Sequence, residues 1–534
     1  MQNKFFSIFL PILLMSVLAI GVLIGSLFFG NKPILYPNSS QKSIQKIQEV
    51  LQYVQQNYAD TVNFDKLTTI GLEKMIETLD PHSIYIPKQD VTEANMGLSA
   101  NFVGIGIEFL ILKDTLFVIN TLKNSPSEKA GIKAGDKIIE VNQKNIAGKN
   151  NQISEKKVFE LLRGKEGTEV KLGILRYNSK KNQTKNIITK TIKRVTFPTQ
   201  SIEISLMWDK NTGFIKISRF NINSYKDFRK ELKKLIDLGM KKLILDVRDN
   251  PGGYLDNAVN IVDEMLAGKD TIVYTDGKGK RFDNISKAKN KGIFESGKII
   301  VLIDEGSASA SEVLAGALQD YDRATLVGRR TYGKGLVQMP IELSDGAELR
   351  LTIAKYYTPS GRCIQKPFSK NYRRETAERY SSGELFEEKN IKIDKKQIFK
   401  TKKGRKVYGG GGITPDIFVA LDTNQLNKLS QWTDEDVLRI FVLNYINENQ
   451  NKLSKISFEK FIKEFNFDDI FWNQLWKIGK NAKIESTPEQ YKKLRPELTK
   501  NIKEMIAKSI FSDENFWRLS LLQDEIFNKA LEKL

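Results

Sequence analysis

The chain of 534 residues contains a single cysteine, Cys363, and a single histidine, His82. One cysteine cannot form a disulfide within the chain, so cysteine usage does not indicate a redox compartment. The usual ligands of a protein zinc site are also missing, and we expect neither a metal nor an organic cofactor. A Ser-His-Asp triad would have to use His82, which we instead interpret as a turn residue satisfied by backbone.

The chain carries an excess of basic residues without any motif typical of nucleic-acid binding. It has 84 Lys and Arg against 64 Asp and Glu, a formal net charge of +20. Such an excess can attract nucleic acid or an anionic membrane surface. Because the lysines are scattered among acidic residues along the chain, we expect solvated helix faces and no nucleic-acid partner.

Residues 5–30 contain no charged side chain and are long enough to cross a bilayer as a helix. We therefore predict a single-pass anchor in the inner (cytoplasmic) membrane, with the bulk of the protein on the periplasmic side. The alternative is a cleaved signal segment and secretion into the periplasm.

A short apolar run at 299–303 predicts a buried strand, and a helix is predicted to begin around Ser309. At such a turn, backbone N–H groups are unpaired and the helix dipole favours negative charge. The residues alone leave Ser307, Ser309 and Ser311 open as candidate nucleophiles. Ser309 and Glu312 also spell a capping box, so a purely structural role for the serine is the alternative.

Lys334 and Gln338 alternate with apolar residues, and residues four apart in a strand share a face. A lysine can act as a general base if burial lowers its pKa enough to leave the amine neutral. Gln338 could orient that amine by accepting a hydrogen bond without adding a charge.

The stretch RDNPGG at 248–253 joins a predicted strand to a predicted helix. Its paired glycines would let backbone approach a reacting carbonyl closely. The N–H of Gly252 or Gly253, together with the N–H of Ala310, would then form a two-donor oxyanion hole. An ordinary glycine turn is the alternative.

Residues 102–109, FVGIGIEF, and the later SPSEKAGIKAGD at 125–136 resemble a PDZ domain. In such a loop, successive N–H groups converge on a terminal carboxylate, and a bound peptide adds a strand to the sheet. The loop residues that we expect to bind peptide are Gly104, Ile105, Gly106 and Ile107.

The motifs GSASASE at 306–312, GKGLVQ at 333–338 and LDPHSIY at 79–85 resemble the carboxyl-terminal processing proteases, S41-type serine peptidases with a PDZ domain. The resemblance implies that Ser309 is the nucleophile, Lys334 the general base and Gln338 the residue that positions the lysine. Family members usually read RNNPGG where this chain has Asp249, a departure that we expect to be tolerated.

The implied function is an endopeptidase that binds protein C-termini and cleaves near them, for processing or degradation of envelope proteins. The alternative is a non-catalytic PDZ scaffold or adaptor at the membrane. A third hypothesis, a crotonase-like acyl-CoA enzyme, fits the PDZ-like region and the apolar N-terminus poorly. A second copy of the chain and an adaptor protein are open as partners, beside protein substrates and the membrane.

The predicted fold class is α/β and multidomain, because strands and helices alternate through the catalytic motifs. A β-rich PDZ domain would precede a crotonase-like α/β protease core, and the C-terminus is helical by pattern. The predicted domains are a membrane or signal segment (1–30), a linker and helical region (31–97), the PDZ domain (98–195), the protease core (196–423) with a basic exposed insertion (366–406), and a C-terminal helical domain (424–534).

Overall fold

The computed structural model describes residues 15–17, 38–149, 151–176, 187–368, 372–421, 431–432 and 436–534. It divides into two compact units, Met1–Leu72 and Glu73–Leu534. The first unit contains helix α2 (Asn38–Asn57) and most of α3 (Phe64–Glu77), which continues into the second unit. The second unit contains the serine, lysine and glycine motifs.

The centre of the second unit is a six-stranded sheet that is parallel except at one edge. The first strand pairs antiparallel to its neighbour, and the other five run parallel. Long apolar runs in the middle strands fit this arrangement, because parallel strands are usually covered on both faces. In spatial order the strands are β10 (Ile202–Met207), β11 (Thr212–Ile217), β12 (Lys242–Asp246), β15 (Lys298–Ile303), β16 (Thr325–Gly328) and β21 (Ile417–Phe418).

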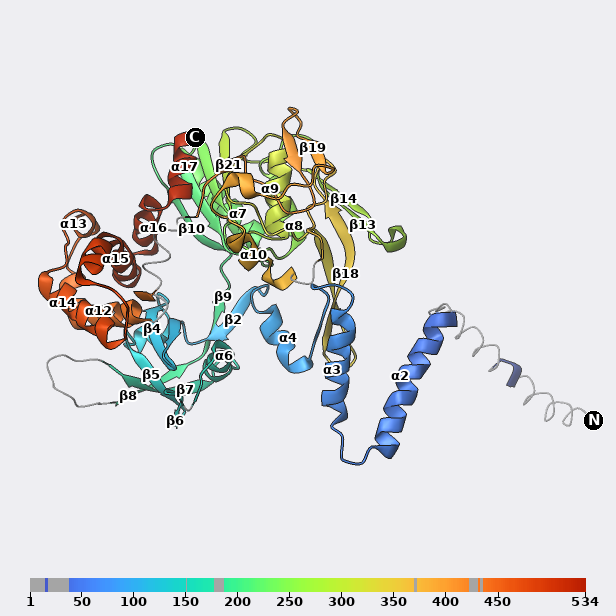
Figure 1. Ribbon diagram of the computed structural model, residues 1–534, viewed down its shortest axis with the longest axis horizontal. Coiled ribbons are helices and arrows are strands. Elements are labelled where there is room, and N and C mark those ends of the chain that lie inside the picture. The colour runs from blue at the N-terminus through green and yellow to red at the C-terminus, as the bar shows by residue number, and fades with distance from the viewer. Residues whose placement is uncertain are drawn as a thin grey trace, which may run out of the picture. The chain divides into compact units, whose positions relative to one another are not determined.

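One face of this sheet is covered by helices α7 (Ser224–Asp237), α8 (Leu255–Asp263) and α9 (Ala310–Asp320), drawn in green to yellow-green in Figure 1. Alternate residues of each strand face opposite sides. Leu243 and Leu245 accordingly belong to the core beneath these helices. Ile244 between them points to the other face.

The last two helices of the chain cover that other face. Helices α16 (Asp513–Leu522) and α17 (Glu525–Lys533) contribute Leu521 and Phe527, which pack with Phe214 of β11 and Ile244. The C-terminus therefore completes the core around this sheet, a role that the sequence pattern did not indicate.

A second sheet lies beside the first and contains the strand that follows Lys334. Gln338 on this strand is paired with Thr352, next to an irregularity in the register. A short helix, α4 (Lys88–Asn95), follows the first strand. The strands are β1 (Ile84–Ile86), β13 (Thr271–Gly277), β14 (Asn284–Lys287), β17 (Leu336–Glu342) and β18 (Glu348–Tyr357).

The region predicted to bind peptides forms its own sheet around an apolar core that includes Val118, Ile138 and Leu172. Short helices α5 (Pro126–Lys129) and α6 (Glu155–Leu162) accompany it, and β2 (Asn101–Gly104) pairs with β9 (Val195–Pro198) beside it. The strands of the sheet are β3 (Ile107–Leu112), β4 (Thr115–Thr121), β5 (Lys137–Val141), β6 (Lys144–Asn145), β7 (Glu169–Leu175) and β8 (Ile187–Lys193).

Four more helices near the C-terminus surround an aromatic-rich core that includes Trp432, Phe471 and Trp472. From α12, Leu443 packs against Leu112 and Phe117 of the sheet that begins with β3. These helices therefore contact that sheet directly, while α16 continues onto the core sheet. They are α12 (Val437–Leu453), α13 (Phe458–Lys463), α14 (Asp469–Asn481) and α15 (Pro488–Ile510).

The basic stretch 366–406 is less exposed than predicted. Arg379 and Glu384 within it are buried, and Glu384 forms ion pairs of 2.7 Å with both Arg379 and Arg330. Charged residues can be buried when they are paired in this way. The stretch contains helix α10 (Glu375–Ser381), strands β19 (Ile398–Lys400) and β20 (Lys406–Tyr408), and two 3-10 turns (Tyr372–Arg374, Glu388–Asn390).

The predicted membrane localisation is contradicted. None of the helices in the described part of the chain combines the length and apolar character needed to cross a bilayer. The predicted segment, 5–30, lies outside the described residues apart from 15–17.

The contact between α17 and the core sheet gives a stability prediction. Phe527→Ala would remove a fully buried side chain beneath Phe214 and Trp208. We expect a loss of about 3–5 kcal/mol in the free energy of unfolding, measured by denaturant titration with tryptophan fluorescence. Leu522→Ala is the matched control, because Leu522 on the adjoining helix is 51% exposed. Equal midpoints for the two variants would contradict the packing role of α17.

Candidate active site

Ser309 occupies a strained turn between β15 and α9. Its backbone has φ 57° and ψ −113°. A positive φ is uncommon for a residue with a side chain and is found often at functional sites. Asp304 supports this turn, because its carboxylate accepts hydrogen bonds from the N–H groups of Gly306 and Ser307 at 3.0 and 3.1 Å.

Glu312 joins the serine turn to the lysine segment. Its carboxylate accepts hydrogen bonds from the N–H of Ser309 at 2.8 Å, the hydroxyl of Thr331 at 2.5 Å, and the N–H groups of Gly333 and Lys334 at 2.7 and 2.8 Å. Burial raises the pKa of Glu312 to about 6, and these hydrogen bonds oppose the rise. The residue therefore does more than complete a capping box.

Lys334 lies next to Gln338, and its Nζ donates to Gln338 Oε1 at 2.7 Å. Burial lowers the pKa of Lys334 from its usual 10.5, Arg350 lowers it further, and the negative charges of Glu312 and Asp80 oppose the shift. The structure thus brings together the two residues that the alternation placed on one face.

Tyr356, which the sequence analysis missed, holds the serine turn and the lysine segment together from a second direction. Its fully buried hydroxyl lies 3.0 Å from the carbonyl oxygen of Ser309 and in hydrogen-bond contact with that of Lys334. Burial raises the pKa of Tyr356 well above 10. The phenol is therefore a neutral donor near neutral pH. The one feature of the sequence that could have pointed to Tyr356 is its position on the predicted strand after Gln338.

The glycine turn lies directly against the serine turn. A Cβ on Gly252 would stand 2.8 Å from Ser309 Cβ and 3.0 Å from the nitrogen of Ala310. Gly252 also has φ 97°, a backbone conformation that favours glycine. Both the close contacts and the backbone conformation therefore disfavour a side chain at this position.

The structure distinguishes between the two predicted oxyanion donors. The N–H of Gly252 donates to Asn250 Oδ1 at 2.9 Å, so it is already engaged. Phe220 binds the residues on either side of Gly253, through Gly252 O and the N–H of Tyr254. This pattern directs the Gly253 N–H away from Phe220. The oxyanion role of Gly252, Gly253 and Ala310 stays a prediction.

Ser309, Lys334 and Gln338 line one cavity of about 350 Å³ together with Gly252 and Gly253. The described lining residues do not include His82. The Nε2 atom of His82 lies 2.5 Å from the Tyr372 hydroxyl, so its partner is a side chain rather than the expected backbone. Burial and the charges of Lys334 and Lys366 lower the pKa of His82 to about 4, with Asp80 opposing them.

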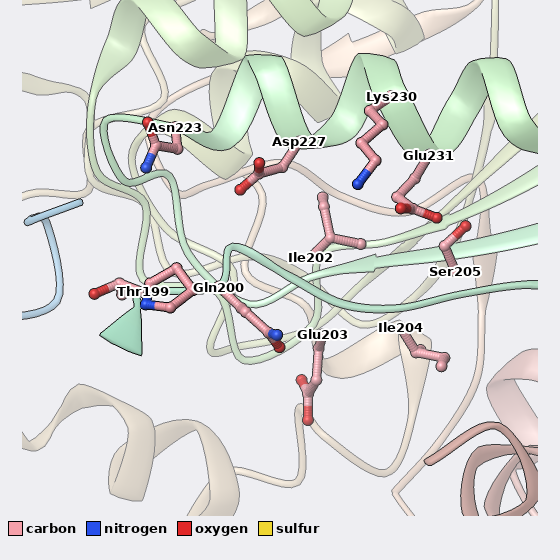
Figure 2. A pocket seen from close by; sticks show the side chains of 11 residues that line it. Thr199, Gln200, Ile202, Glu203, Ile204, Ser205, Asn223, Asp227, Lys230 and Glu231 are labelled. Carbon is pink, nitrogen blue, oxygen red and sulfur yellow. The ribbon is translucent and has the colours of Figure 1, made fainter. Parts of the chain in front are cut away.

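A second cavity, of about 410 Å³, provides an internal comparison (Figure 2). It contains Ser205 from β10 and Lys230 from α7, the same two residue types as the first cavity. Lys230 is exposed, however, so nothing excludes water from its amine. Figure 2 shows Asp227 and Glu231 beside it, pointing from α7 toward β10. Lys230 thus differs from Lys334, whose amine is part-buried.

The predicted peptide-binding loop lies at the start of β3, the edge strand of its sheet. Gly106 has φ 78°, and a Cβ there would stand 2.5 Å from Ser125 Cβ. The carbonyl of Ile105 accepts a hydrogen bond from the Ser127 hydroxyl at 2.7 Å. Neither Gly104 nor Ile107 lines the cavity at Ser309, so the structure places this loop apart from it.

Comparison with known proteins identifies the family. Residues 211–372 match the model of peptidase family S41, residues 118–176 a PDZ domain, and residues 429–512 a family of unknown function. A probable CtpA-like serine protease of Staphylococcus aureus (strain MRSA252) is 35% identical over 361 residues, 67% of this chain and 70% of that protein. The chain belongs to peptidase family S41.

A second S41 relative, a probable CtpA-like serine protease of Staphylococcus epidermidis (strain ATCC 12228), is 35% identical over 331 residues. The match covers 61% of this chain and 64% of that relative, less than two thirds of its length. The photosystem II D1 C-terminal processing protease superposes with a TM-score of 0.37 at 25% identity, covering 71% of this chain and 87% of that one.

The family prediction from the sequence is confirmed. This S41 chain is a mixed α/β protein with a PDZ domain, a peptidase-family core and a helical C-terminal region. Ser309, Lys334, Gln338 and the glycine pair all lie within the part matched to the family. Among the described residues, no group of three or more His, Cys, Asp or Glu side chains is placed to hold a metal ion.

The contacts of Glu312 give a prediction for stability. Glu312→Gln would replace an acceptor oxygen with an amide donor facing buried N–H groups, and each donor left without a partner costs about 1–3 kcal/mol. We expect a lower free energy of unfolding in denaturant titration. Glu342→Gln, an exposed carboxylate on β17, is the control and should unfold like the wild type. An unchanged midpoint for Glu312→Gln would show that the carboxylate does not join the two segments.

Proposed function

We propose that the chain is a serine-type endopeptidase that binds protein C-termini through its PDZ domain and cleaves near them, with a Ser/Lys dyad. One observation carries the proposal: Ser309, in its strained turn, lines the same cavity as Lys334, whose pKa is lowered by burial. An amine that loses its proton more readily than usual is what a lysine base requires.

In the proposed reaction, Ser309 Oγ attacks the carbonyl carbon of the scissile peptide bond and its proton passes to Lys334 Nζ. The tetrahedral intermediate then expels the amine, which takes that proton, and an acyl ester remains on Ser309. Water attacks the ester with Lys334 again accepting a proton, and the serine hydroxyl leaves with it. No further co-reactant is needed, so protons and bonds balance.

The N–H groups of Gly253 and Ala310 would stabilise the negative oxygen of the tetrahedral intermediate. Two fixed donors in a partly enclosed site act strongly on a charge that forms only in the transition state. The contact of Gly252 with the serine turn supports this role, because it brings the two donor-bearing segments together.

Gln338 would hold the lysine in place for the transfer. Its Oε1 accepts from Lys334, so its Nε2 is directed elsewhere, and that buried Nε2 has no hydrogen-bond partner among the described residues. Buried donors are rarely left unpaired.

The overall proposal is tested by incubating the wild type and Ser309→Ala with a protein extract and mapping new C-termini by mass spectrometry. We expect fragments ending near original C-termini with the wild type alone. Identical fragments from both proteins would favour the non-catalytic PDZ scaffold instead.

Single substitutions in the dyad should rank in a defined order. Ser309→Ala and Lys334→Ala should each lower kcat by at least about 10⁴-fold, because members of such a unit act together. Gln338→Ala should lower kcat/KM by about tenfold to a hundredfold, the effect of one hydrogen bond to a charged group. Lys355→Ala is the control, since Lys355 is exposed on the neighbouring strand. Full activity of Lys334→Ala would contradict the dyad.

The pH dependence should report the Lys334 amine. Because the neutral amine is the base, kcat/KM should rise with pH and level off above the lowered pKa of Lys334, below 10.5. Arg350→Met removes a positive charge that lowers this pKa and frees the negative Glu348, its partner at 2.6 Å. Both changes favour the ammonium, so the rising limb should move to higher pH. A limb that stays in place, or moves to lower pH, would contradict the assignment of Lys334.

A further inference from the structure

The cavity at Ser309 is electropositive. Two arginines, Arg219 and Arg350, line it beside the Lys334 amine, and among its described lining residues none is acidic. Partly enclosed cavities with charges of one sign concentrate ligands of the opposite sign. The cavity therefore favours an anionic group on the bound peptide.

Arg219 is the cation whose charge is left uncompensated. Arg350 donates to Glu348 at 2.6 Å and to Asn95 at 3.0 Å, and Lys334 is held by Gln338. The guanidinium of Arg219 is half-buried and has neither an ion pair nor a hydrogen bond within the described residues. A planar guanidinium presents a fork of N–H donors that matches a carboxylate.

Arg219 is also held beside the proposed oxyanion donor. It precedes Phe220, which forms hydrogen bonds with the residues on both sides of Gly253. On its other side the guanidinium lies against Gly97, where a Cβ would come within 2.2 Å of Nη1. A glycine at 97 thus leaves room for the side chain in a fixed position.

We propose that Arg219 is a specificity-determining residue that binds a carboxylate of the substrate near the scissile bond, and this inference rests on the proposed peptidase function. The carboxylate is either an acidic side chain or the terminal carboxylate of the peptide. Both sources present the same planar anion, and the experiment separates them.

The test uses fluorescence-quenched ten-residue peptides with Glu, Gln or Lys beside the cleavage site, each as free acid and as C-terminal amide. For the wild type, we expect kcat/KM to be about tenfold to a hundredfold higher for the peptide that carries the bound carboxylate than for its Gln or amide counterpart. In Arg219→Gln this preference should fall, reaching about one for Glu over Gln peptides, and Arg219→Glu should favour the Lys peptides. Lys226→Gln, an exposed lysine on α7, has the same change in net charge and should keep the wild-type ratio.

Replacing Glu by Gln or amidating the terminus shows which carboxylate is bound. Amidation also weakens PDZ binding. Only the part of the free-acid preference that disappears in Arg219→Gln is therefore assigned to Arg219. A wild type without any carboxylate preference, or an unchanged ratio in Arg219→Gln, would overturn the inference.

Binding to the Ser309→Ala variant, followed by fluorescence anisotropy of the same peptides, separates this inference from the peptidase proposal. If the wild type cleaves no peptide, the peptidase proposal fails. An Arg219-dependent preference in binding would still support the carboxylate site, and its absence would overturn it.

Discussion

The active-site arrangement depends on one buried carboxylate. Glu312 receives donors from the serine turn and from the segment that carries Lys334, which follows 22 residues later. Without this link, the Tyr356 hydroxyl, the chain between the two segments and general packing would remain to join them. Because the carboxylate has to satisfy several fixed N–H groups at once, it defines the separation between the serine and lysine segments.

The Glu312 carboxylate also limits how far burial can lower the pKa of Lys334. Burial of Lys334 disfavours the ammonium, while the nearby negative charge of Glu312 favours it. The hydrogen bonds to Glu312 come from neutral groups, so its charge is stabilised without a neighbouring cation in direct contact. Gln338 is likewise uncharged, and it accepts a hydrogen bond from the Lys334 amine.

The helical C-terminus connects the two functional regions. Leu443 on α12 packs on the sheet of the PDZ domain, and Phe527 on α17 packs on the second face of the core sheet. A parallel sheet needs apolar cover on both faces. The sequence match to a family of unknown function over 429–512 covers the first of these contacts. The region is therefore part of the folded unit rather than an appended tail.

The sequence by itself determined what depends on neighbours in the chain. The strand before Ser309, the helix after it, the shared face of Lys334 and Gln338 and the need for glycine at 252 all follow from local spacing and backbone sterics. The motifs were also sufficient to predict the family. The apolar composition of 5–30 could not by itself determine localisation, and that prediction failed.

Tertiary structure decided what depends on contacts between distant segments. Glu384 is buried between Arg330 and Arg379, and Arg219 lies in the cavity with Ser309. Spacing in one segment contains no information about the partners that another segment supplies. Sequence alone therefore predicts that a charged residue is exposed. Only the fold shows whether that residue has a partner.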